Sequence, residues 1–199
     1  MSTDADIPGV SEEKKRASYA DLVALPENVL GQLIDGELFA LPRPGSDHTE
    51  ASTELLLLLG APFRRGLGGP GGWRLLAEPE LHLDEDVLVP DLAGWREERF
   101  PRRSGPFYSV VPDWLCEVLS PSTTLLDRNR KLPRYARAGV DYVWLVDPAA
   151  QTLEAFRRER DGWRLLATFC GQAKVRAEPF AAFEFPLGLL WPDAGPVAR

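Results

Sequence analysis

Short apolar segments alternate with polar turns along the chain, and their lengths predict strands more often than helices. Segments that are apolar on both faces, or that alternate between turn residues, are typical of strands in a buried sheet. Four segments have this character: 73–83, 87–95, 114–119 and 142–146. Two β-hairpins are also predicted, at 32–41 around Asp35-Gly36 and at 152–168 around Asp161-Gly162, because Asp-Gly pairs favour tight hairpin turns.

Helices are predicted in three places. A short one spans 19–25 before Pro26. A second spans 47–59, where Asp47 and Glu50 have the spacing of a capping box and apolar residues recur at helical intervals. A third follows Thr123 and ends near Gly139, with Pro133 opening or kinking it.

The predicted order is helix, three strands, helix, strand, with β-hairpins at both ends. This order predicts a mixed α/β sheet sandwiched by helices. A chain of 199 residues suits one well-cored domain. We expect a single domain over residues 18–192, with a flexible tail over residues 1–17 and another over residues 193–199.

Composition adds expectations about the compartment. No apolar run approaches the roughly 18 residues of a membrane span, and the first residues are polar. We therefore expect a cytoplasmic protein with no membrane partner. Cys116 and Cys170 lie in apolar segments, which favours buried free thiols over a disulfide in that compartment.

The formal net charge of −7 argues weakly against nucleic acid as a partner. Residues 1–54 carry 11 acidic and 4 basic side chains and so account for the whole excess. Between Arg128 and Arg137 there are five basic residues and no acidic one, which indicates a local positive patch.

Two carboxylates interrupt the apolar segments. Asp91 follows Val89-Pro90 in the second predicted strand, and Glu117 lies in the third, 26 residues later. An ionised carboxylate without a partner is costly to bury, so such a group is paired, protonated or bound to a metal. Two acids converging from adjacent strands form an oxygen-rich site suited to Mg²⁺ or Mn²⁺. A metal there would polarise a phosphoryl oxygen and activate water, and Lys131 could position that water or stabilise developing charge.

Several strings of residues resemble the Uma-two family, a group of restriction-endonuclease-like proteins of bacterial cytoplasm. The strings are Leu33–Glu37, Val89–Leu92, Glu117–Thr123, Asp127 with Lys131–Pro133, and Tyr135–Val140. The resemblance covers roughly residues 18–192 and is most specific from Glu117 to Asp147. It implies the restriction-endonuclease-like fold, with Asp91 as the motif aspartate and Glu117 as the following acid.

The chain departs from the nuclease motif at one position. The motif has a lysine two residues after the second acid, and this chain has Leu119 there. Lys131, in the predicted helix, is the nearest replacement, and the family pattern carries a lysine at that position. We predict that its Nζ lies within about 6 Å of a Glu117 carboxylate oxygen, the range in which opposite charges stabilise each other.

Other side chains have both a functional and a structural interpretation. Glu50, His48 and Glu80 could join the metal shell; the first two also suit a helix start, and Glu80 could pair with an arginine. Asp127 is interpreted as a helix-start residue, and the structural alternatives for Lys131 are a solvated helix lysine or one that pairs with Asp127. Tyr135 is interpreted as a core residue that could also contact a phosphate.

The preferred hypothesis is a Mg²⁺-dependent endonuclease that hydrolyses DNA through metal-activated water, with Asp91, Glu117 and Lys131 as catalytic residues. A homodimer would suit the cutting of both strands. The alternatives are a non-catalytic nucleic-acid-binding or regulatory module of the same fold, and an interaction protein whose carboxylates form only a buried ionic network.

Overall fold

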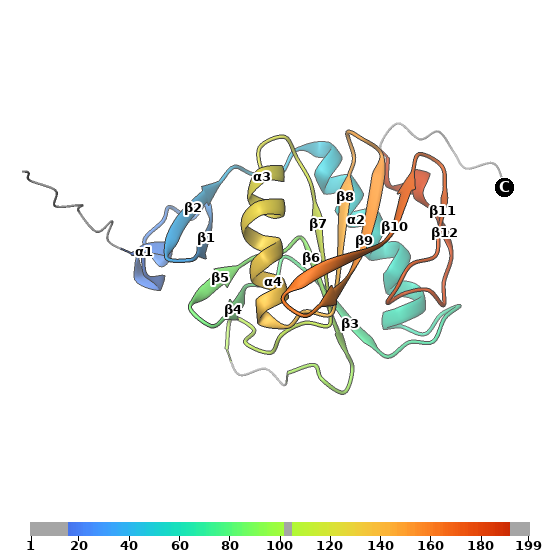
Figure 1. Ribbon diagram of the computed structural model, residues 1–199, viewed down its shortest axis with the longest axis horizontal. Coiled ribbons are helices and arrows are strands. Elements are labelled where there is room, and N and C mark those ends of the chain that lie inside the picture. Colours follow the sequence, from blue (N-terminus) through green and yellow to red (C-terminus); the bar gives the residue numbers. More distant parts are fainter. Residues whose placement is uncertain (1–15, 102–104, 192–199) are drawn as a thin grey trace, which may run out of the picture.

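The computed structural model describes residues 16–101 and 105–191 (Figure 1). Most of the two predicted tails lies outside these ranges. Within the predicted N-terminal tail, the Ala17 N–H donates a 2.8 Å hydrogen bond to Gly36 O, at the turn of the first hairpin.

The larger of two main sheets has six strands in the order β10-β9-β8-β7-β6-β3. The strands are β3 (Trp73–Ala77), β6 (Leu92–Arg96), β7 (Trp114–Val118), β8 (Tyr142–Asp147), β9 (Thr152–Glu159) and β10 (Gly162–Cys170). Only the β7–β8 pair is parallel, joined by a helical crossover, and the other neighbours are antiparallel. The mixed α/β class is thus confirmed.

The smaller sheet has four strands in the order β2-β1-β5-β4. The strands are β1 (Leu30–Ile34), β2 (Glu37–Leu41), β4 (Leu81–Leu83) and β5 (Asp86–Leu88). The predicted first hairpin is confirmed, since Asp35 and Gly36 form its turn with φ angles of 53° and 78°. These positive angles are the reason why an Asp-Gly pair is favoured there.

The predicted strands 73–83 and 87–95 were each wrong in one respect, because each is broken and passes from one sheet to the other. The first breaks after Ala77, where Glu78 has φ 46°. The second breaks at residues 89–91, where Pro90 has no N–H to continue a ladder. The Glu78 N–H donates to Asp91 O over 3.0 Å, so the two breaks lie side by side. Apolar periodicity does not reveal such a break, because the pattern of apolar residues is the same before and after the break.

The helices are α1 (Tyr19–Val23), α2 (Ser46–Leu59) with the π-helical η1 (Gly60–Arg64), and α3 (Thr124–Leu126), η2 (Asp127–Lys131) and α4 (Leu132–Ala138). The predicted cap of α2 was wrong, because Gly45 is the N-cap and Asp47 lies in the first turn. Pro133 lies in the first turn of α4, directly after the π-helical residues of η2. Gly139 ends that helix with φ 95°, as predicted.

The six-stranded sheet has a separate core on each face. Side chains of β7 alternate between them: Trp114, Cys116 and Val118 pack with α2, whereas Leu115 and Leu119 pack with α4. Figure 1 shows α4 in front of the sheet and α2 behind it. Glu117 has the same parity as Leu115 and Leu119, so it faces α4. This alternation directs the acid toward the helix that carries Lys131.

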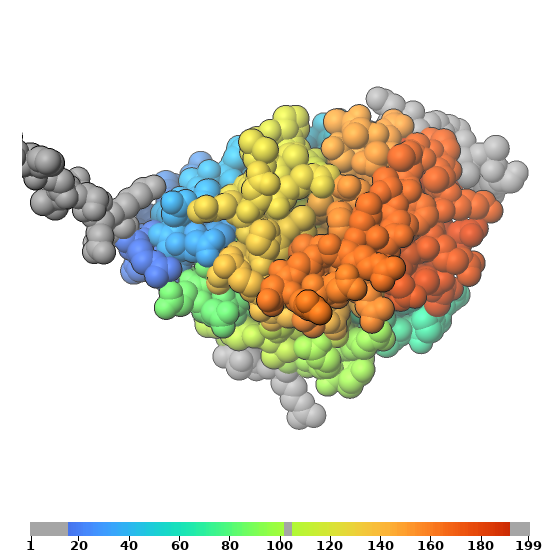
Figure 2. All heavy atoms as spheres, viewed as in Figure 1, coloured from blue at the N-terminus to red at the C-terminus, as the bar shows by residue number. Residues whose placement is uncertain are grey.

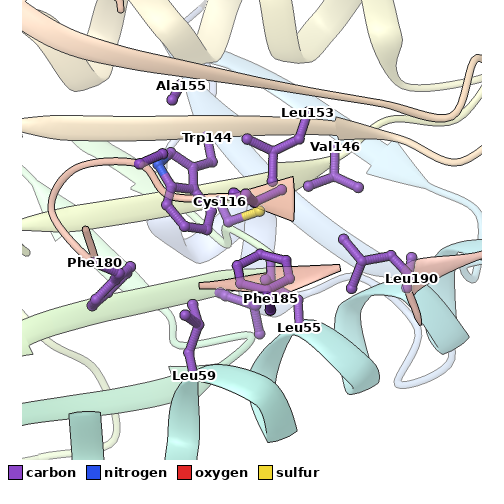
Figure 3. Close-up of a cluster of buried hydrophobic side chains, with 14 of the residues drawn as sticks. Leu55, Leu59, Cys116, Trp144, Val146, Leu153, Ala155, Phe180, Phe185 and Leu190 are labelled. Atoms are coloured by element: carbon purple, nitrogen blue, oxygen red, sulfur yellow. The ribbon is translucent and has the colours of Figure 1, made fainter. Parts of the chain in front are cut away.

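Sequence patterns missed the C-terminal part of the core that lies between the sheet and α2. It consists of β11 (Lys174–Val175), β12 (Phe185–Pro186) and the 3-10 turn η3 (Leu187–Leu190), whose strands are too short for periodicity to indicate. Figure 3 shows Phe185 and Leu190 beside Leu55 of α2 and below Cys116 and Trp144 of the sheet.

Both cysteines are free, as predicted, but only Cys116 is buried. The burial predicted for Cys170 was wrong, since it ends β10 at an edge of the sheet and is exposed. Among the described residues, no helix combines the length and the apolar character needed to cross a bilayer.

Candidate functional site

A cavity of about 270 Å³ lies where the two sheets meet. Its walls come from the β1–β2 hairpin, residues 42–48 at the start of α2, both strand breaks, and the loop 120–123 that follows β7. The polar residues at its floor include Asp91, Glu117, Asp127 and Lys131. The β1–β2 hairpin is held by ion pairs to the continuous helix of η2 and α4. These are Arg130–Glu37 at 2.7 Å and Arg134–Asp35 at 3.2 Å. Figure 2 shows the hairpin (blue) lying against this helix (yellow).

Lys131 lies between two buried acids. Its Nζ is 2.8 Å from Glu117 Oε1 and 3.1 Å from Asp127 Oδ1, and each of the three side chains is at most 4% exposed. The predicted proximity of Lys131 to Glu117 is therefore confirmed, as is its pairing with Asp127 one helical turn earlier. The lysine comes from the helix, whereas the nuclease motif carries its lysine on the strand.

Tyr135 contacts Glu117 at the same oxygen as Lys131. Its hydroxyl donates to Glu117 Oε1 over 2.6 Å, and its ring is fully buried in the core beside α4. Glu117 is thus bonded by two groups from one helix, one cationic and one neutral. Helical spacing of four residues puts Lys131 and Tyr135 on the same face and could have indicated this contact.

Asp91 differs from its predicted setting. It lies in the break between β5 and β6, not inside a strand, and its side chain is 17% exposed. Its Oδ2 accepts a 2.6 Å hydrogen bond from the Val118 N–H, which ties it to the end of β7. Its Oδ1 is 3.2 Å from His48 Nε2. Asp91 and Glu117 line the same cavity, Asp91 from the break before β6 and Glu117 from β7.

Burial and neighbouring charges shift the protonation of this cluster. Burial raises the pKa of Glu117 to about 8; Lys131 opposes this shift, and Asp127 and Asp91 add to it. Burial lowers the pKa of Lys131, but the three acids outweigh it, so the net shift is upward. Burial also lowers the pKa of His48, yet the hydrogen bond and charge of Asp91 leave it above its ordinary value. Glu117 therefore holds its proton more readily than an ordinary carboxyl group.

Other predicted candidates lie in different places. His48 lines the cavity, and its Nδ1 is buried without a hydrogen-bond partner among the described residues. Glu50 is exposed and does not line the cavity. Glu80 also lies outside it, 2.7 Å from His82 Nε2 and 3.1 Å from the Tyr19 hydroxyl. Neither Glu50 nor Glu80 is placed to join Asp91.

Two lining residues were missed by sequence reasoning. Glu78 reaches the cavity from the first strand break. Gln32 is buried, and its Oε1 accepts a 3.0 Å hydrogen bond from the Val89 N–H beside Pro90. A buried amide in a strand next to an apolar wall is a signal that sequence inspection could have used.

The predicted positive patch is largely neutralised. The four arginines of the segment pair with acids: Arg128 with Glu154, Arg130 with Glu37, Arg134 with Asp35 and Asp86, and Arg137 with Asp35. These pairs fasten the helix to the hairpin and to β9, and they reduce the positive charge left for a polyanion.

The fold is that of a restriction-endonuclease-like protein. The model of the Uma-two family (Uma2), described as "Putative restriction endonuclease", matches residues 18–188, so the chain belongs to that family. A crystal structure described as a putative nuclease from Anabaena variabilis ATCC 29413 is similar, with a TM-score of 0.72 and 21% identity. The match covers 87% of this chain and 97% of that one. No curated protein matches the chain.

The fold family implies a divalent metal, and the donor chemistry here is compatible with one. Asp91 and Glu117 supply carboxylate oxygens to one cavity, and Glu78 lines the same space. Among the described residues, no three acidic, histidine or cysteine side chains converge into a preformed cage. Mg²⁺ does not require such a cage, because it is usually held by one or two carboxylates together with waters and substrate phosphates.

Proposed function

We propose that this protein is a Mg²⁺- or Mn²⁺-dependent endonuclease that hydrolyses phosphodiester bonds in DNA. The observation that carries the proposal is the 2.8 Å contact between Lys131 Nζ and Glu117 Oε1 at the floor of a cavity that Asp91 also lines. This contact supports the proposal because it pairs an acid with a lysine, as the nuclease motif does, with the lysine supplied by a different element. The family description and the similar fold support the same activity.

In this proposal Asp91 and Glu117 hold the metal, which would polarise the scissile phosphate and lower the pKa of an attacking water. The ammonium of Lys131 holds the carboxylate of Glu117 in place and stabilises negative charge that develops on the phosphate. Tyr135 holds the same carboxylate oxygen, Oε1, through its hydroxyl, which leaves Oε2 to face a metal. The Val118 N–H holds Asp91 through Oδ2, and His48 Nε2 lies 3.2 Å from Oδ1, so a metal at Oδ1 would take the place of the His48 contact.

The test is cleavage of plasmid, linear duplex, single-stranded DNA and RNA with Mg²⁺, Mn²⁺ or EDTA. We expect metal-dependent cleavage that falls at least about 100-fold in Asp91→Asn and in Glu117→Gln, since each removes a ligand of the activating metal. Glu97→Gln is the matched control, because Glu97 pairs with Arg74 at the surface and lies outside the cavity. Absence of cleavage on every substrate, together with no Mn²⁺ binding by calorimetry, would exclude the proposal.

A non-catalytic DNA-binding module of the same fold is the second candidate. It is favoured by the engagement of Glu117 with Lys131 and Tyr135, which would have to loosen before a metal binds. Salt-dependent DNA binding without turnover would support it. A homodimer remains a prediction, and light scattering across micromolar concentrations tests it.

A further inference from the structure

The cavity that contains the acids is small and deep. Its volume of about 270 Å³ is just below the roughly 300–1,000 Å³ of ordinary small-molecule pockets. The side chain of Glu117 is 2% exposed and that of Asp91 is 17% exposed. A phosphate must therefore enter the cavity to reach either acid.

The rim of the cavity is mostly apolar. Leu30, Pro42, Pro44 and Pro121 surround the opening and are all exposed. These four side chains suit a sugar or a base face. Two further exposed residues of the lining are polar, Ser122, whose hydroxyl can bond a phosphate, and Glu78, which would repel one. Among the described residues that line the cavity, Arg43 is the one exposed cation. A protein that makes about 6–10 phosphate contacts, by contrast, neutralises those phosphates with Lys and Arg side chains.

A paired strand does not suit this shape. In a duplex the phosphates of one strand follow each other at about 3.4 Å along a stiff axis. Moving one of them into a recess would require its neighbours to separate. A single strand, a frayed end or a tail can bend one nucleotide into the recess while the remainder stays outside.

Resting on the proposed endonuclease function, we propose that the substrate is single-stranded nucleic acid, with one nucleotide entering the cavity and Arg43 contacting its phosphate. The apolar rim packs against the sugar and base of that nucleotide. The arginines of the helix contribute little, because Arg128, Arg130, Arg134 and Arg137 are engaged with acids.

The cleavage test compares a labelled 30-nucleotide single strand, its blunt duplex, and the duplex with single-stranded tails, all with Mn²⁺. We expect the single strand and the tails to be cut at least about tenfold faster than the blunt duplex, with cuts confined to unpaired nucleotides. Equal rates inside the blunt duplex would overturn this inference and leave the nuclease function intact. If no DNA or RNA is cut, the proposed function fails and this inference fails with it.

Binding gives a second, independent measurement with the full-length Glu117→Gln protein and the same single strand. One or two phosphate contacts predict a slope of about −0.7 to −1.4 for the logarithm of affinity against that of salt concentration. Arg43→Ala should reduce the magnitude of this slope by about 0.7. Arg65→Ala, an exposed arginine outside the cavity, is the matched control and should leave it unchanged. A slope steeper than about −3, or no response to Arg43→Ala, would refute the proposed contact.

Discussion

Glu117 offers a direct test of the electrostatics of the site, because replacing it by glutamine mimics its protonated form. The pKa of Glu117 in the folded protein is raised from an ordinary 4.5 to about 8 by burial. A raised pKa means that the folded state holds the proton over a range in which the unfolded state has lost it. The stability that this group contributes is therefore full below about pH 4.5 and is lost as the pH rises toward 8.

The magnitude follows from the size of the shift. Each pKa unit corresponds to about 1.4 kcal/mol, so a shift of this size amounts to about 3–5 kcal/mol between pH 4.5 and 8. Glu117→Gln lacks this loss and still offers an amide oxygen to the Tyr135 hydroxyl. We expect the variant and the wild type to differ little at pH 5 and the variant to be more stable at pH 8.5. For a domain of this size the difference is about 10 °C in melting temperature.

The assay is thermal and urea unfolding of both proteins between pH 5 and 8.5, followed by circular dichroism without added metal. Glu97→Gln should follow the wild type through this range, because Glu97 is half exposed and pairs with Arg74 at the surface. Parallel profiles for Glu117→Gln and the wild type would refute the reasoning. They would mean that Lys131 keeps Glu117 ionised throughout.

Two further substitutions test the site and its frame. Lys131→Ala should lower turnover at least about tenfold without abolishing metal binding in calorimetry, and unchanged turnover would remove its catalytic role. The same change should lower the free energy of unfolding by about 3–5 kcal/mol, because it leaves Asp127 and Glu117 without their buried cation. Gly94→Ala should cost about 1–3 kcal/mol in urea unfolding, because its Cβ would lie 2.9 Å from Leu75 Cδ2 and 3.2 Å from the Trp114 ring; wild-type stability would show that these side chains yield freely.

Sequence reasoning reached most elements of the fold, but neither the short C-terminal strands nor the way in which the strands divide into sheets. Apolar alternation located the strands, and Asp35-Gly36 located the first hairpin turn. The apolar pattern of a strand does not indicate which sheet the strand belongs to. It could therefore not show that 73–83 and 87–95 each pass between two sheets. Pro90 was the available signal, because a residue without an N–H is confined to the edge or end of a strand.

The candidate site was predicted unevenly for a related reason. Glu117 was found because it is a charged residue in an apolar segment. Lys131 was found because it lies in a string of residues that resembles the family. The pair of Asp127 with Lys131 was considered from its spacing, but the burial of Asp127 was not predicted, and neither was the bond from Tyr135, interpreted as a core residue, to Glu117. Glu78 reaches the cavity through a turn whose positive φ leaves no pattern in the sequence.

The position of Lys131 also explains how a leucine can stand where the nuclease motif has its lysine. Leu119 is 3% exposed and belongs to the core between the sheet and α4. A lysine there would add its charge to that apolar core unless its stem reached the acids. The helical lysine avoids this problem, since Asp127 supplies a second carboxylate one turn away and compensates the ammonium when Glu117 is protonated. Exchanging leucine and lysine between 119 and 131 would therefore separate the ammonium from Asp127, so the two placements are not equivalent even when both reach Glu117.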